Sequence, residues 1–492
     1  MTLNQARLVR LNEAPIEKNG AFVLYWMQMQ RRFARNHALD YAIKCANELG
    51  KPLVVYEGLR LDYPWASARL HRFILEGMRD NQMTAARLGF TYWPFVETPR
   101  AKARGLLAKI AARAALVITD DFPCFIIPKQ SHSFATKFGR AVIAVDSNSI
   151  VPLRLLGAAP YAASHLRPRI HKAFSEAFAH RSAVKPRPPR FDASKIDPGF
   201  TLATFGDLDR LVAKLPIDQS VRPVGARPGG SVAARAQLKA FVKKGLPIYA
   251  EERSDPMPPA AFHGSGLSPY LHFGHLGIEE VVAAAFAFAS DDDVPHLHLD
   301  NAGKREGFFG DNVNVNAFLD EALTWRDVGY VWHVHRRDDT ASLKASLPAW
   351  AYATLHLHTG DKREFNYSMD EWERGATHDP LWNAAQRELV ATGGIHNYLR
   401  MLWGKKVIEW SRTPEEAYQT LVHLNNKYAL DGRNPNSYTG ILWCFGLFDR
   451  PWTPERKVFG QIRYMSSTNT AKKFRLGPYL DWVATLPQGE PA

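Results

Sequence analysis

The chain of 492 residues contains only three cysteines, and they stand far apart. Cys45, Cys124 and Cys444 are too few and too widely spaced for a disulfide framework or a zinc site. An iron–sulfur cluster normally needs more thiolates than the chain has. We therefore expect buried or inert thiols in a reducing compartment, and no bound metal.

Long apolar runs are also missing from the sequence. No stretch reaches the roughly 18 apolar residues that a helix needs to span a bilayer. Residues 1–20 mix Arg, Asn, Glu and Lys with apolar positions and do not form a secretory signal. Internal repeats and low-complexity tracts are absent too. These absences predict a cytoplasmic protein, nuclear in a eukaryote, with no membrane association.

The charge balance is clearly basic. The chain has 62 Lys and Arg against 49 Asp and Glu, a net charge of +13, and its 46% hydrophobic residues are enough for a large core. A surplus of this size favours a polyanionic partner, most commonly nucleic acid. Charge alone is equally compatible with a basic protein that has no such partner.

Residues 1–150 alternate short apolar runs with helical patterns. This alternation is typical of a parallel α/β sheet. No G-x-G-x-x-G motif follows the first strand, which argues against an ordinary Rossmann dinucleotide site. We expect strands at 21–27, 52–56, 90–95, 115–119 and 141–145, and helices at 37–49, 66–88 and 101–113.

The rest of the chain reads mainly as helices separated by polar loops. Residues 185–190 are rich in proline and form neither helix nor inner strand, and residues 221–231 form a second loop rich in Pro and Gly. The predicted fold class is α/β plus all-α. A Rossmann-like domain with a parallel sheet spans 1–180, a linker and connecting loop span 181–235, and a large helical domain spans 236–492.

A loop of small residues leads into a helix at Ser268. There Ser268 suits the N-cap and Pro269 the first helical position. Glycines allow a close approach of the backbone, and the free N–H groups at a helix start favour a phosphate. A plain capped helix after a flexible loop explains the same residues.

Tryptophan is abundant, with 13 residues. Trp403 and Trp410 stand seven residues apart in a predicted helix over 395–410, so they share one face about 10 Å apart along the axis. Trp382 lies on the preceding helical segment and is placed to fall between them. The arrangement suits stepwise electron transfer through indoles, although large aromatic residues at helical spacing also fill cores.

Two further patterns carry charge. Arg400 and Asp431, with Asn425 nearby, suit an ion pair beside an apolar heterocycle, or equally a helix end with surface charges. Residues 456–475 interleave Lys and Arg with aromatic residues, which suits phosphates and bases as well as a solvated basic face.

Taken in order, these motifs resemble the photolyase/cryptochrome family from Gly264 to Phe474, and within it the class II cyclobutane pyrimidine dimer photolyases. Gly394-Ile395 stands before His396 where class II enzymes usually have Lys-Met, so we expect a divergent branch. The matching stretches are SGLSPYLHFG at 265–274, LWNAAQ at 381–386, YLRMLWGKK at 398–406, residues 425–436, and FGQIRYM at 459–465.

The resemblance implies a deoxyribodipyrimidine photo-lyase, a carbon–carbon lyase that repairs UV-damaged DNA in light. Reduced FAD in the helical domain would donate an electron to a cyclobutane dimer flipped out of the duplex. The N-terminal domain would hold an antenna chromophore, a deazaflavin or a folate. A monomer without an obligate protein partner is expected. The alternatives are a cryptochrome-like blue-light photoreceptor and a (6-4) photolyase.

The resemblance also assigns roles to residues. The positions that match FAD contacts are Tyr249, Ser265, Gly266, Leu267, Ser268, Arg400 and Asp431. Those that match catalysis and electron transfer are Glu321, Asn425, Trp403, Trp382 and Trp410, with Asn425 facing the flavin and Trp410 outermost in the chain. Those that match the substrate pocket are Trp325, Asn397, Met401 and Trp443.

Overall fold

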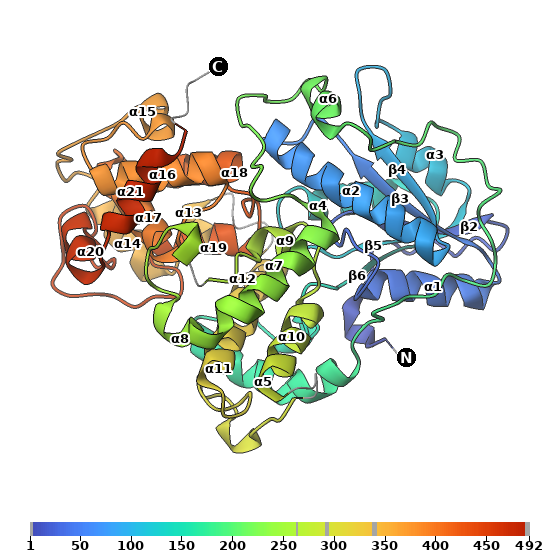
Figure 1. Cartoon of the computed structure of the whole chain (residues 1–492), viewed down its shortest axis with the longest axis horizontal. Coiled ribbons are helices and arrows are strands. Elements are labelled where there is room, and N and C mark those ends of the chain that lie inside the picture. The colour runs from blue at the N-terminus through green and yellow to red at the C-terminus, as the bar shows by residue number, and fades with distance from the viewer. Residues whose placement is uncertain (1–2, 262–263, 291–294, 337–341, 488–492) are drawn as a thin grey trace. The chain divides into compact units, whose positions relative to one another are not determined.

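The structure is a computed structural model, and it describes residues 3–261, 264–290, 295–336 and 342–487 (Figure 1). It divides into two compact units. The sheet unit comprises Met1–Gly157, Arg169–Ala240 and Gly266–Leu297, and the helical unit comprises Ala158–Pro168, Phe241–Ser265 and His298–Ala492. Among the helices described, none combines the length and the apolar character that crossing a bilayer requires.

The sheet unit contains a six-stranded sheet in the order β1-β6-β5-β2-β3-β4. Every neighbouring pair is parallel except β1 and β6, which are antiparallel. The strands are β1 (Leu8–Arg10), β2 (Phe22–Met27), β3 (Leu53–Leu59), β4 (Thr91–Val96), β5 (Ala114–Asp120) and β6 (Val142–Val145). The main connecting helices are α1 (His37–Leu49), α2 (Ala68–Leu88), α3 (Leu106–Ala111) and α4 (Ile127–Lys137).

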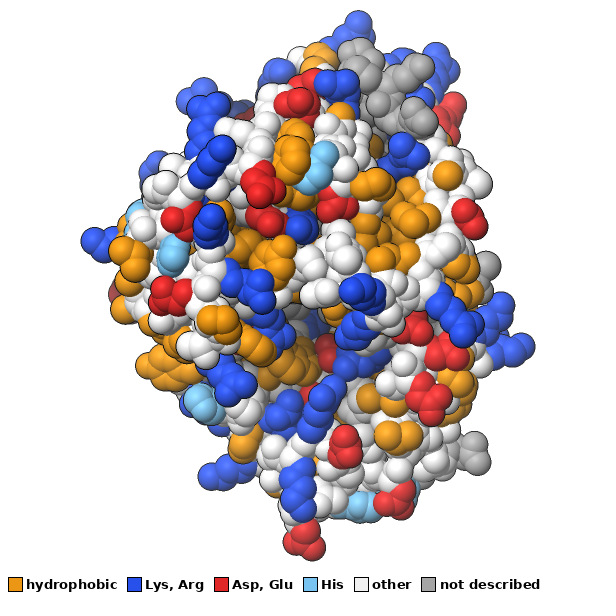
Figure 2. Space-filling model, turned by 90° about the vertical axis from the view of Figure 1, so that its left-hand side faces the viewer, with side chains coloured by type: hydrophobic (Ala, Val, Ile, Leu, Met, Phe, Trp, Pro, Cys, Tyr) orange, Lys and Arg blue, Asp and Glu red, His pale blue; other side chains and the backbone are white. Residues whose placement is uncertain are grey.

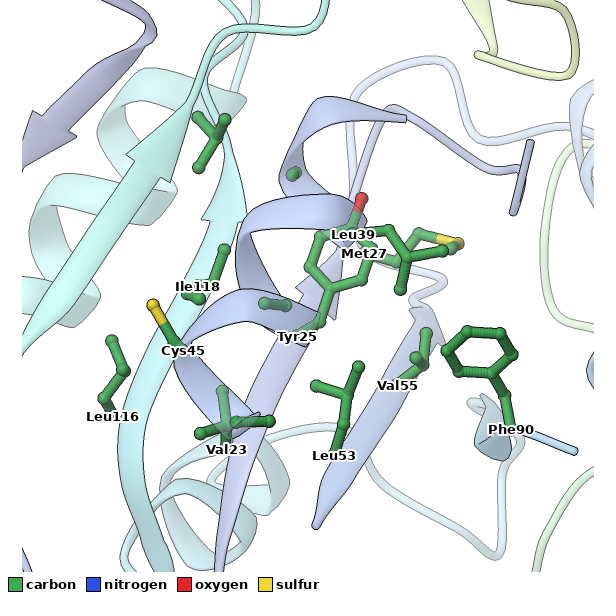
Figure 3. Packing of buried hydrophobic residues seen from close by; sticks show 14 of the residues in the cluster. Val23, Tyr25, Met27, Leu39, Cys45, Leu53, Val55, Phe90, Leu116 and Ile118 are labelled. Carbon is green, nitrogen blue, oxygen red and sulfur yellow. The ribbon is translucent and has the colours of Figure 1, made fainter. Parts of the chain in front are cut away.

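Hydrophobic packing on both faces explains why the central strand β2 is apolar throughout. All six of its residues are buried. Tyr25 belongs to the core cluster that contains Leu39 of α1 (Figure 3). Its neighbour Trp26 points to the opposite face, into the cluster that contains Ile110 of α3. A strand covered by helices on both sides has no polar face, which is typical of parallel sheets.

Local capping sets the ends of α1, which spans the residues predicted for it. The side chain of Asn36 accepts hydrogen bonds from the backbone N–H groups of Ala38 at 3.0 Å and Leu39 at 3.1 Å. Gly50 ends the helix with φ at 65°, a conformation that costs glycine little.

A buried carboxylate organises the loop after β2. Asp120, at the end of β5, accepts the backbone N–H groups of Gln28 at 2.9 Å, Met29 at 2.7 Å and Gln30 at 2.9 Å through Oδ2. Its Oδ1 accepts the hydroxyl of Tyr25 at 2.7 Å. The carboxyl ends of two adjacent parallel strands are thereby tied together by one side chain.

The helical part of the chain confirms the predicted all-α region. Thr413 caps helix α18 by accepting the N–H of Glu416 at 3.1 Å. The larger helices of the helical unit are α11 (Val313–Leu319), α12 (Arg326–His335), α14 (Ala349–Leu357), α15 (Met369–Arg374), α16 (Pro380–Thr392), α17 (Asn397–Trp410), α18 (Pro414–Tyr428), α19 (Pro435–Cys444), α20 (Ser467–Lys473) and α21 (Gly477–Thr485). The remaining helices are α5 (Ala163–Ala179), α6 (Leu208–Ala213), α7 (Gly230–Lys244), α8 (Tyr249–Glu252), α9 (Ser268–His272), α10 (Ile278–Ser290) and α13 (Leu343–Ser346).

The fold class predicted from the sequence, α/β plus all-α, is therefore confirmed, with three local differences. Strand β1 and helix α4 were not predicted, and the helix predicted over 101–113 shortens to α3. All three cysteines are buried and form no disulfide, as expected.

Candidate functional site

The Arg400–Asp431 ion pair forms in the helical unit. Arg400 lies on α17, and its Nη2 lies 3.1 Å from Oδ1 of Asp431, while Nη1 lies 3.4 Å from Oδ2. Both side chains are partly exposed, at 26% and 15%. The Nε atom of Arg400 is buried and finds no acceptor among the residues that the structure describes. The pair therefore still presents a donor for a polar acceptor.

The turn that carries Asp431 is held by a residue with no predicted role. Asn426 is fully buried. It accepts the N–H of Arg433 at 2.9 Å through Oδ1 and donates to the hydroxyl of Tyr438 at 3.2 Å. Its neighbour Asn425, on the last turn of α18 and 3% exposed, donates to Asn426 Oδ1 at 3.3 Å. Asn426 therefore fixes the turn, and Asn425 lies next to it.

The three predicted tryptophans come together. The rings of Trp382 and Trp403 are stacked, with centroids 6.3 Å apart and planes at 7°. Trp382 also contacts Trp410 at 6.3 Å and 66°. Their exposures are 0%, 2% and 3%, so all three indoles lie away from water. Trp382 contacts both other indoles, as the sequence spacing predicts.

Sequence reasoning missed three aromatic neighbours of Trp410, namely Trp372, Tyr367 and His378, whose ring centroid lies 4.8 Å from that of Trp410. Trp372 on α15 is stacked on Trp410 at 6.0 Å and 14°, and it meets Trp382 edge-on at 5.0 Å. The ring centroids of Tyr367 and Trp410 are 5.7 Å apart. No signal in the sequence pointed to Trp372, because it lies on a different helix from Trp382 and Trp410. We call Trp372, Trp382, Trp403 and Trp410 the tryptophan cluster.

Glu321 lies on a short π-helical turn, η6 (Asp320–Trp325), and π-helical turns occur frequently at functional sites. Its Oε1 lies 2.5 Å from Nη1 of Arg253. Burial raises the pKa of Glu321, and the positive charge of Arg253 opposes that rise only in part. Arg253 also lies over the ring of buried Tyr249, 5.7 Å from its centroid.

Two predicted pocket residues, Trp325 and Trp443, are stacked at 5.2 Å and 19°. The indole N–H of Trp325 donates to Oδ2 of Asp320 at 3.1 Å. Asp320 in turn binds Arg167 through two hydrogen bonds of 2.7 and 3.0 Å. Asp320 and Arg167 were not predicted, because their positions are 153 residues apart.

The other two predicted pocket residues lie on α17. Asn397 is the first residue of the helix and is exposed, and Met401 is half-buried one turn further on. The backbone carbonyl of Met401 lies 3.9 Å from Sγ of Cys444. Met401 is thereby placed beside the end of α19, which carries Trp443.

The predicted phosphate-binding loop divides between the units. Ser265 belongs to the helical unit, whereas Gly266, Leu267 and Ser268 belong to the sheet unit. The expected N-cap at Ser268 is wrong. The helix α9 begins at Ser268 itself, and buried Leu267 occupies the N-cap position without a side-chain hydrogen bond. Gly266 has φ at 63°, and the helix starts one residue earlier than predicted.

Two solved structures share this fold. A bacterial class III photolyase from Agrobacterium tumefaciens matches with a TM-score of 0.66 and 16% identity, over 94% of this chain and 86% of that one. The cryptochrome of Synechocystis sp. PCC6803 matches with a TM-score of 0.65 and 15% identity, over 94% and 88%. The fold is therefore one that photolyases and cryptochromes have in common.

Curated relatives extend the likeness to the sequence. The deoxyribodipyrimidine photo-lyase of Methanothermobacter thermautotrophicus is 33% identical over 98% of this chain and 99% of its own length. Those of Oryza sativa and Arabidopsis thaliana are 32% and 30% identical, over 88% and 90% of their lengths and 95% and 96% of this chain. No family model matches the chain. The chain belongs to the photolyase/cryptochrome family.

Proposed function

We propose that this chain is a deoxyribodipyrimidine photo-lyase that repairs cyclobutane pyrimidine dimers in light, with FAD bound by its helical unit. The observation that carries the proposal is the Arg400–Asp431 pair, in which the buried Nε of Arg400 has no acceptor among the described residues. Arg400 lies on the same helix as Trp403 and Trp410 of the tryptophan cluster. Names of relatives from an archaeon and two plants point to the same reaction.

The residues of the site fit a flavin. A flavin ring offers carbonyl and nitrogen acceptors, and the buried Nε of Arg400 needs one. Asp431 holds the guanidinium in place, and the Asn425 amide supplies both a donor and an acceptor nearby. Tyr249 and Ser265 of the helical unit are the proposed contacts to the rest of the cofactor. The roles of Gly266, Leu267 and Ser268 stay predictions. Reduced FAD, when bound, supplies the light absorption and the electron for repair.

The tryptophan cluster is the proposed route for electrons that restore the reduced cofactor. Trp403 stands one turn from Arg400 on α17, so it is the proposed inner member. Trp382 and Trp410 follow, with ring centroids 6.3 Å apart at each step. Burial of all three rings excludes water, which keeps the charge in the indoles during transfer.

Trp325 and Trp443 are the proposed walls of the lesion pocket. Their stacked rings form an aromatic surface suited to bases turned out of a duplex. Met401 and Asn397 are the proposed further contacts. Glu321, whose pKa burial raises, is the proposed hydrogen-bonding group at the damaged bases.

DNA binding is supported by the charge of the surface. The chain as a whole carries a net charge of +13, and Figure 2 shows one face on which Lys and Arg side chains stand among hydrophobic, Asp and Glu side chains. Positive groups neutralise phosphates, and apolar or aromatic groups contact unpaired bases. We further assign the chain to a divergent class II branch, with the sheet unit as the domain for a deazaflavin or folate antenna.

The test is a repair assay. Purified and chemically reduced protein is mixed with oligothymidine that carries cyclobutane dimers, and the recovery of thymine absorbance is followed in blue light and in darkness. A parallel substrate carries (6-4) photoproducts. Recovery only in light and only with cyclobutane dimers is the expected result. Recovery of the (6-4) substrate, or no recovery from protein with photoreducible FAD, would contradict the proposed reaction.

A further inference from the structure

The two innermost indoles of the tryptophan cluster donate their N–H groups to neutral amide oxygens. Trp403 donates to Oε1 of Gln386 at 3.0 Å, and Trp382 donates to the backbone carbonyl of Trp403 at 3.1 Å. We propose that Gln386 is a positioning residue of the electron route, which fixes the ring of Trp403 and keeps its proton on the indole while the ring is oxidised. This inference rests on the proposed function.

The surroundings of Gln386 fix which end of its amide faces the indole. Its side chain, on α16, is fully buried. Its Nε2 donates to the backbone carbonyl of Glu373 at 3.2 Å. The carboxylate of Glu373 is engaged elsewhere, by His423 at 2.6 Å and Lys427 at 2.7 Å. With the amide flipped, its N–H would face the indole N–H of Trp403 and its oxygen would face the carbonyl oxygen of Glu373. Only the observed orientation therefore satisfies both neighbours.

This orientation has a chemical consequence. When Trp403 gives up one electron, its ring becomes a cation whose N–H is far more acidic than that of the neutral indole. A basic partner would take the proton, and the ring would then need both an electron and a proton to recover. The amide oxygen of Gln386 is not a base, so Trp403 recovers by accepting one electron from Trp382, and no proton moves. The negative end of the amide dipole also stabilises the transient positive charge.

The sharpest variant is Gln386→Glu, which has nearly the same shape. At low pH the neutral carboxyl can accept from the indole and donate to the carbonyl of Glu373, so photoreduction should match the wild type. As pH rises and the introduced carboxyl ionises, it becomes a base for the oxidised Trp403. The yield of oxidised Trp410 should then fall, because a Trp403 radical that has lost its proton cannot recover by accepting an electron alone from Trp382.

The measurement is flash photolysis of flavin-loaded protein across the pH range, read by the spectra that distinguish protonated from deprotonated indole radicals. Asn383→Asp is the matched control, because it makes the same amide-to-acid change on α16 at a side chain that binds Thr377. The control and the wild type should not show the loss at high pH. A Gln386→Glu protein that follows the wild type at every pH would overturn the inference.

A second readout needs no photochemistry. In the purified full-length protein labelled with 15N-tryptophan, the indole N–H signal of Trp403 is assigned by its loss in Trp403→Phe. Gln386→Met keeps the volume and removes the acceptor, so this signal should shift and exchange faster with solvent. An unchanged signal would refute the hydrogen bond itself. If that signal shifts but the wild type shows no photoreduction, the hydrogen bond stands and the inference about electron transfer fails, whereas the proposed function is tested separately by the repair assay on chemically reduced protein.

Discussion

Removing the carboxylate of Asp320 should weaken both the helical unit and the proposed lesion pocket. Asp320 is 2% exposed and holds Arg167 through two hydrogen bonds of 2.7 and 3.0 Å. It also accepts the indole N–H of Trp325, which is stacked on Trp443. Asp320→Ala therefore leaves a guanidinium charge buried without its partner and frees Trp325 to change its orientation.

The magnitude follows from the burial of Arg167, whose side chain is 9% exposed. Breaking a buried pair by removing one member costs about 3–5 kcal/mol. Arg305, 3.9 Å from Asp320 and 56% exposed, contributes little. With a urea dependence of about 3 kcal/mol per M, the upper end of the usual range, the unfolding midpoint should fall by roughly 1 M. Circular dichroism during urea unfolding measures this shift.

A double variant separates stability from binding. Arg167→Met combined with Asp320→Leu replaces the pair by apolar side chains, and such replacements are often neutral or stabilising. The midpoint should recover, while affinity for dimer-containing DNA stays low because Trp325 still lacks its acceptor. A midpoint of Asp320→Ala equal to that of the wild type would refute the energetic argument. Full lesion affinity in the double variant would refute the positioning of Trp325.

Three further outcomes are expected. Trp403→Phe should block photoreduction of oxidised FAD and spare repair by enzyme that is already reduced, as flash absorption and the repair assay would show; normal photoreduction would place the electron route elsewhere. Arg400→Ala should lose FAD during purification, measured as the flavin-to-protein absorbance ratio, and full retention would contradict its assignment. Burial opposes ionisation of Glu373, but bonds from His423 and Lys427 outweigh it and lower its pKa from 4.5 to about 2. Because this pKa is depressed, the stabilisation is present above about pH 4.5 and is lost as the pH falls towards 2, so the urea midpoint should drop more steeply there than in Glu373→Gln.

The alternation of apolar runs was enough to predict most of the parallel sheet. Its strands are buried on both faces, so each appears in the sequence as a short continuous apolar run ended by turn residues. Strand β1 was not predicted, because it is three residues long and only partly buried. The domain limits are harder to predict, since the chain crosses between the compact units several times. The limits 1–180 and 236–492 remain predictions.

Within the site, spacing along one helix predicted the relation of Trp403 to Trp410, because helical geometry fixes it. Asn426, Gln386 and Asp320 could not be found in this way. Each acts through hydrogen bonds to residues on other segments, and sequence order contains no direct sign of such contacts. The family resemblance supplied roles for Arg400 and its neighbours, but the side chains that hold those residues in place became visible only in three dimensions.

The carboxylate of Asp120 has a consequence for what the sheet can bind. In nucleotide-binding α/β domains the backbone N–H groups after the first strand receive a phosphate. Here the N–H groups of Gln28, Met29 and Gln30 are already bound by Asp120. An anion attached to the same chain competes at an effective concentration that few free ligands reach. The donors of this loop are therefore occupied by a side chain of the same protein. A phosphate could bind these three N–H groups only by displacing the carboxylate of Asp120.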